Sequence, residues 1–114
     1  MPLVRLLTNT PLAKGVEIQI AKRATSIAAE AMGKPETVTM AVVESDVTMT
    51  FGGTTDPTAL FELEGIELAA EPTESMCQRF SDLAEEVLEI PASRVFVKQL
   101  SVPRGRWAGN RKVY

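Results

Sequence analysis

The sequence predicts an α+β domain made from two copies of one strand–helix–strand unit. An alignment of the two halves that places Arg79 on Arg23 superposes many similar residues along the chain. The matched pairs include Leu83 with Ile27, Ala84 with Ala28, Glu86 with Glu30 and Pro91 with Pro35. Because each unit makes a right-handed crossover between parallel strands, two units give a four-stranded sheet with both helices on one face.

The first unit covers about residues 1–50. An apolar run at residues 3–7 predicts a buried strand, because a polar turn cluster follows it. A helix that stops at Gly33 is predicted from the apolar stripe Val16, Ile20, Ala24, Ile27, Ala28 and Ala31. Residues 38–43 form the next predicted strand, residues 49–51 a short strand and residues 52–57 a loop.

The second unit covers about residues 57–105. Residues 59–68 alternate apolar and acidic side chains, which indicates a strand with one face in water. Thr73 is the expected N-cap of a helix with the apolar stripe Met76, Phe80, Leu83, Ala84 and Val87. Residues 95–100 are predicted to form the last long strand. The C-terminal tail, residues 106–114, is expected to fold back as a small hairpin.

Composition and charge restrict the class of protein. The 114-residue length fits one domain, and 45% hydrophobic and 24% charged residues are ordinary proportions for a globular protein. We find no apolar run near the ~20 residues of a membrane span and no signal peptide, so we expect a cytoplasmic protein. The acid-free, basic stretch after Glu89 predicts either an anionic partner or a solvated basic face. Because the net charge is −3, nucleic acid is not the expected partner.

Two residue types limit the chemistry. The chain has no histidine and one cysteine, Cys77, so it lacks a multi-cysteine zinc site, a disulfide framework and a Ser-His or Cys-His catalytic pair. We expect Cys77 to be a small packed side chain on the second helix. Catalysis would therefore use amines, carboxylates, hydroxyls or guanidinium groups, without a metal or other cofactor.

One face of the predicted sheet has nothing to cover it. Residues 38–43 are apolar on both faces of their strand, but the two helices cover only one face of the sheet. Large apolar surfaces are rare on soluble monomers. The sequence therefore favours a symmetric oligomer in which subunits cover one another's sheets.

Pro2 is the main candidate for chemistry. A small residue after the initiator methionine permits removal of Met1, which leaves Pro2 as an N-terminal secondary amine. The pKa of an α-amino group is about 7.7–8.0, and burial in an apolar pocket lowers that pKa. A neutral amine at pH 7 can act as a general base or a nucleophile. The alternative is a proline that merely follows Met1, and a retained Met1 would make its nitrogen a non-basic amide.

Several short motifs occur in order along the whole chain. They are Met1-Pro2, Thr8-Asn9-Thr10, Gly33-Lys34-Pro35, Phe51-Gly52-Gly53, Asp56-Pro57, Ala59-Leu60, Arg94-Val95 and Trp107. Together they resemble the macrophage migration inhibitory factor (MIF) family of the tautomerase superfamily. The resemblance implies the MIF fold, with a four-stranded mixed sheet, assembled as a homotrimer with active sites between subunits. It also leaves non-classical secretion open.

The resemblance also implies the residues of the site. Pro2 matches the catalytic base. The implied substrate-binding residues are Lys34, Ile66, Phe96, Lys98 and Trp107. Among these, Lys34 would hold the substrate carboxylate, and Trp107 would line the pocket mouth unless it is plain packing. Phe96 and Lys98 stand where well-known members have tyrosine and asparagine. The family's Cys-x-x-Cys pair is absent, which argues against a thiol oxidoreductase.

The implied function is keto–enol tautomerisation of small 2-keto acids such as phenylpyruvate, with Pro2 moving the proton α to the carbonyl. Lys98 and the basic tail favour compact or doubly anionic keto acids over hydroxyphenylpyruvate. Two alternatives stay open. One is a MIF-like signalling or binding protein with little turnover. The other is a different proline-initiated reaction, dehalogenation or decarboxylation of a small acid, with Arg104 or Arg106 in the pocket.

Overall fold

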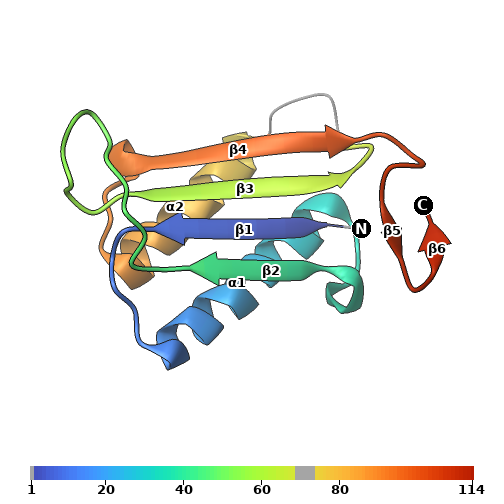
Figure 1. The fold of residues 1–114 in the computed structure, drawn as a ribbon, viewed down its shortest axis with the longest axis horizontal. Coiled ribbons are helices and arrows are strands. Elements are labelled where there is room, and N and C mark those ends of the chain that lie inside the picture. Colours follow the sequence, from blue (N-terminus) through green and yellow to red (C-terminus); the bar gives the residue numbers. More distant parts are fainter. Residues whose placement is uncertain (1, 69–73) are drawn as a thin grey trace.

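The computed structural model describes residues 2–68 and 74–114. Within these residues, two long helices pack on one face of a four-stranded sheet (Figure 1). The elements in chain order are β1 (Leu3–Thr8), α1 (Lys14–Met32), the 3₁₀ helix η1 (Glu36–Val38), β2 (Met40–Glu44), β3 (Ala59–Ile66), α2 (Glu74–Leu88), the 3₁₀ helix η2 (Ala92–Arg94), β4 (Val95–Val102), β5 (Ala108–Gly109) and β6 (Lys112–Val113). The predicted α+β fold with a duplicated βαβ unit is confirmed.

The strand order in the sheet is β2-β1-β3-β4. β1 runs parallel to β2 and antiparallel to β3, while β3 runs parallel to β4. Each half of the chain thus supplies one parallel pair, and the two halves meet at the central β1–β3 pair. The register places Leu3 between Met40 of β2 and Glu64 of β3, an arrangement that becomes important at the candidate site.

The core fills the space between the sheet and the helices. Every second residue of β1 and β3 points toward the helices and is buried. The largest fully buried apolar side chains include Phe61, Phe80, Leu6, Ile20, Leu63, Leu83 and Ile90. The rings of Phe61 and Phe80 stack with their centroids 4.8 Å apart, so they join β3 directly to α2. The apolar stripes predicted for both helices therefore face the core, except for Ala31, which is exposed near the end of α1.

The sheet face turned away from the helices is apolar on its two edge strands. Large exposed hydrophobic side chains there are Met40 and Val42 on β2, and Phe96 and Leu100 on β4. Phe96, for example, is 62% exposed. The uncovered apolar surface expected from the sequence is therefore present in the isolated chain.

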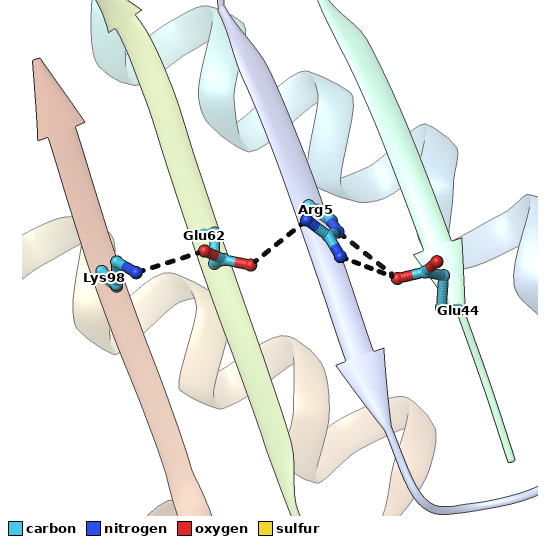
Figure 2. Close-up of polar contacts among 4 residues, drawn as sticks. All are labelled: Arg5, Glu44, Glu62 and Lys98. Carbon is cyan, nitrogen blue, oxygen red and sulfur yellow. Dashed lines mark hydrogen bonds and ion pairs between the residues drawn. The ribbon is translucent and has the colours of Figure 1, made fainter. Parts of the chain in front are cut away.

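The middle of the same face is charged. Figure 2 shows Lys98, Glu62, Arg5 and Glu44 in a row that crosses all four strands. The Nζ atom of Lys98 lies 3.4 Å from Glu62 Oε2, and Arg5 lies 3.8 Å from Glu62 Oε1 and 3.3 Å from Glu44 Oε2. Exposed ion pairs contribute little stability individually. Their consequence here is that Glu62 and Lys98 already have charged partners.

The region before β3 differs from its prediction. Residues 49–51 do not form a strand. Instead, Phe51 and Thr54 make an isolated antiparallel bridge around Gly52 and Gly53, whose φ angles are 61° and 80°. Two successive positive φ angles are characteristic of a tight two-residue turn, for which glycine is the preferred residue. The chain therefore turns back at once, and no strand forms.

Other local predictions need smaller adjustments. β2 begins at Met40 rather than at residue 38, because η1 occupies the residues before it. Cys77 is exposed, so its prediction as a packed side chain is wrong: it follows the buried Met76 and falls outside the apolar stripe of α2. The N-cap prediction for Thr73 lies outside the described residues. The tail hairpin is confirmed by the pairing of β5 with β6.

Candidate active site

A cavity of about 600 Å³ lies at the end of the sheet where β1 begins. In Figure 1 the start of β1, the turn before β2 and the β5–β6 hairpin gather at this end. These three segments line the cavity together with the ends of β3 and β4. Its lining includes Pro2, Thr39, Glu64, Val102, Arg106 and Trp107. The site thus combines residues from both ends of the chain.

Pro2 lines this cavity, as its predicted role in catalysis requires. It is fully buried in the chain that begins with Met1. Its carbonyl oxygen accepts a hydrogen bond of 3.0 Å from the backbone N–H of Met40. Proline is suited to this place just before a strand, because it has no N–H to contribute to the ladder. The residue is therefore held to β2 through its carbonyl oxygen and not through its nitrogen, which becomes a free amine only if Met1 is removed.

Three other predicted residues lie at or near the cavity. Trp107 lines it and is half-buried. Ile66 is outside the lining, but its partner across the β3–β4 pair, Val102, is part of it. Lys34 is exposed and also outside the lining, three residues before Thr37, which lines the cavity. Ile66 and Lys34 are thus neighbours of lining residues in the sheet or in the sequence, but neither is part of the lining of this chain.

Phe96 and Lys98 are not brought to the cavity of the same chain. Phe96 pairs with Leu60 near the start of β4, and its ring lies 4.8 Å from the ring of Phe51. Lys98 pairs with Glu62 in the charged row of Figure 2. The cavity begins farther along the sheet, at Glu64 and Val102. Within one chain, Phe96 and Lys98 therefore lie away from the cavity that Pro2 lines.

Sequence reasoning missed Glu64 as a residue of the site and gave Arg106 only as an alternative. Glu64 stands on the outer face of β3, as the alternation of the strand indicated. What the sequence did not show is the register that places it beside Leu3, the residue after Pro2. Arg106 reaches the cavity because the tail hairpin folds over this end of the sheet.

Two further features concern residues 2–68 and 74–114. No group of three or more histidine, cysteine, aspartate or glutamate residues there is arranged to hold a metal ion. Neither helix of this part of the chain is long and apolar enough to cross a membrane.

A family model settles the relationship. The model of macrophage migration inhibitory factor (MIF) matches residues 1–110. The chain belongs to the MIF family. A MIF homologue of Brugia malayi is 27% identical over 115 residues, which cover 100% of this chain and 99% of the relative. A homologue of Wuchereria bancrofti is 25% identical over the same coverage.

Solved structures of MIF relatives have the same fold. The crystal structure of a MIF homologue from Prochlorococcus marinus superposes with a TM-score of 0.88 at 28% identity, over 97% of each chain. A MIF-like protein from Entamoeba histolytica has a TM-score of 0.92 over 99% of this chain and 98% of its own, and its 18% identity indicates likeness of fold alone. The predicted MIF fold is confirmed, and membership of the family supports a tautomerase or cytokine-type function.

Proposed function

We propose that the protein is a keto–enol tautomerase for small 2-keto acids of the phenylpyruvate type, with Pro2 as its general base after Met1 has been removed. The observation that carries the proposal is the burial of Pro2 in a cavity of about 600 Å³, in a chain of the MIF family. Such a volume suits a small acid with one aromatic ring.

The proposed reaction is a proton transfer between carbon and oxygen. The neutral Pro2 nitrogen removes the proton α to the keto group, and a proton returned to the keto oxygen completes the enol. In the reverse direction the protonated amine returns the proton to carbon. Apolar side chains around Pro2, including Val38, Met40 and Val102, favour the neutral amine over its charged form. Lys34 would attract the carboxylate of the substrate to this end of the molecule, while Trp107 would pack against its ring.

We further propose that the complete site forms in a homotrimer. MIF folds typically form oligomers, and Phe96 and Lys98 lie too far along the sheet to join Pro2 of their own chain. A neighbouring subunit that covers the exposed Phe96 and Leu100 side chains would remove apolar surface from water and deliver β4 to the cavity. Ile66 would complete the apolar wall.

Assembly is open to a direct test by light scattering. We expect the processed protein to have three times the 12.4 kDa mass of the chain at micromolar concentration. Leu100→Glu should lower this mass, because it places a charge on the apolar edge strand. Ile18→Glu is the matched control, since Ile18 is also exposed but lies on α1, away from the open sheet face. A monomeric wild type would contradict the shared site.

Turnover is the decisive measurement for the function. The intact mass first establishes that Met1 is absent, and the ultraviolet absorbance of the enol then follows ketonisation of phenylpyruvate and hydroxyphenylpyruvate. We expect catalysis with both substrates and little discrimination for the ring hydroxyl, because Phe96 has no hydrogen-bonding group to offer it. A processed trimer without turnover would instead favour a MIF-like binding or signalling protein. Product analysis with halogenated acrylates and malonate semialdehyde would reveal dehalogenation or decarboxylation.

A further inference from the structure

Two charged side chains line the cavity without a role in the site described so far. Glu64 comes from β3 and Arg106 from the start of the C-terminal hairpin, and both share the cavity with Pro2. Glu64 is half-buried and Arg106 is exposed. Within residues 2–68 and 74–114, neither takes part in an ion pair. The cavity therefore offers one carboxylate and one guanidinium group to a ligand.

By contrast, charged residues close to Glu64 and Arg106 in the sequence do form ion pairs. Glu62 lies on the same face of β3 and contacts both Lys98 and Arg5. Arg104 precedes Arg106 by two residues, and its Nε atom lies 2.8 Å from Glu67 Oε1. The chain thus neutralises the charges next to the cavity but not those that line it. Partial burial of a carboxylate without a cation is costly, and such local costs occur mainly at functional sites.

The register brings Glu64 close to the reacting group. Glu64 pairs with Leu3, and Pro2 directly precedes Leu3 in the chain. Adjacent strands lie about 4.8 Å apart. A carboxylate on one strand and an amine at the start of the next can therefore contact the same small molecule. Arg106 faces this space from the hairpin side of the cavity.

We propose that Glu64 is the second proton-transfer group of this enzyme and that Arg106 binds the substrate carboxylate. This inference rests on the proposed tautomerase function and assigns it a substrate class: 2-keto acids with a single carboxylate. Charge-assisted hydrogen bonds between guanidinium and carboxylate would orient the acid. The enol hydroxyl would then point to Glu64, and carbon 3 to the Pro2 nitrogen.

The proton balance of the reaction is as follows. In ketonisation, the protonated Pro2 amine donates a proton to carbon 3, and the electron pair of the C=C bond forms the new C–H bond. The O–H bond of the enol breaks, its electrons form the C=O bond, and its proton passes to the Glu64 carboxylate. Pro2 ends neutral and Glu64 ends protonated. Transfer of this proton from Glu64 to Pro2 restores the starting state, and the reverse sequence gives enolisation by neutral Pro2.

The carboxylate of Glu64 would also make the site discriminate between substrates that carry one and two negative charges. A second carboxylate on the substrate would enter a cavity that already holds a half-buried negative charge. Lys98, from which the sequence predicted a preference for doubly anionic acids, forms an ion pair with Glu62, so its charge is already partnered when a neighbouring subunit brings β4 to the cavity. We therefore expect phenylpyruvate to be used better than a dicarboxylic 2-keto acid.

The test compares matched variants of the processed, full-length protein. Glu64→Gln should lower kcat for phenylpyruvate about 10²-fold or more, as is typical for loss of a general acid–base group, with little change in KM. The KM for a dicarboxylic 2-keto acid should fall in the same variant, a gain that structural damage would not produce. Arg106→Gln should raise KM by about 10-fold or more, because it removes a charged hydrogen bond. Glu67→Gln and Arg104→Gln remove the neighbouring ion pair and should behave as wild type.

The outcomes separate the two proposals. If the processed wild type has no turnover, the tautomerase function and the catalytic role of Glu64 both fail. The carboxylate site is then tested by calorimetry, which compares the affinity for phenylpyruvate of Arg106→Gln with that of Arg104→Gln. If the wild type is active and Glu64→Gln keeps its kcat, the role of Glu64 alone is wrong. Equal KM values for Arg106→Gln and Arg104→Gln would overturn the carboxylate site.

Discussion

Blocking the Pro2 nitrogen is expected to lower turnover of phenylpyruvate by about 10²–10⁴-fold, the contribution of a general acid–base group. A chain that retains Met1, or carries an uncleaved N-terminal tag, has an amide at this position, and an amide nitrogen has no useful basicity. The fold should be unaffected, because Pro2 is attached to β2 through its carbonyl oxygen and not through its nitrogen. Intact mass and kcat/KM measured on the same samples test this expectation.

Substitution of Pro2 adds a second, independent variant. Pro2→Ala keeps a free amine and the carbonyl that binds Met40, but it replaces the secondary amine with a primary one that has more rotational freedom. We expect a smaller loss than with a blocked terminus. Pro11→Ala is the matched control, because Pro11 is exposed in the turn after β1. A tagged, uncleaved protein with wild-type activity would end the amine mechanism.

The duplicated fold was predictable because both halves carry the same local signals. The alignment that matches Arg79 with Arg23 also places Glu89 on Gly33, and both residues leave their helix in the left-handed region, with φ angles of 57° and 63°. Pro35 and Pro91 then precede equivalent 3₁₀ helices. Helix ends, turns and apolar periodicity are local properties, so a sequence shows them directly.

Most of the motifs that revealed the family hold the scaffold together at the end of the sheet opposite the cavity. The guanidinium group of Arg94 donates hydrogen bonds to the carbonyls of Phe51, Asp56 and Pro57. The side chain of Asn9 donates to the carbonyl of Asp56 and accepts from the N–H of Thr58. These motifs therefore predict fold and not chemistry, whereas Pro2 and Trp107 of the same set reach the cavity.

The charged residues of the site were harder to foresee. Glu62 and Glu64 look equivalent in the sequence, as do Arg104 and Arg106. Only the sheet register and the tail hairpin distinguish the paired member of each set from the one in the cavity. Cys77 shows the same limit on α2, where a shift of one position from Met76 separates a buried side chain from an exposed one. Such distinctions depend on tertiary contacts.

The largest loss of stability is expected from Phe80→Ala. Phe80 is fully buried, and its ring stacks on Phe61 of β3 at 4.8 Å. Truncation of a buried phenylalanine costs about 3–5 kcal/mol, because apolar contacts are lost and a cavity remains. Whole domains are stable by only about 5–15 kcal/mol. The variant should therefore unfold at much lower urea concentration than wild type.

Cys77→Ala is the control for this experiment, since Cys77 lies on the same helix but is exposed. Its effect should stay within about 0.5 kcal/mol of wild type, as for most surface substitutions. All proteins must be compared at one concentration, because assembly makes apparent stability depend on it. The Phe61–Phe80 pair joins α2 to β3, the strand that carries Glu64. Loss of this pair should therefore also weaken substrate binding at urea concentrations below the unfolding midpoint. Equal midpoints for Phe80→Ala and Cys77→Ala would contradict the placement of the core between α2 and β3.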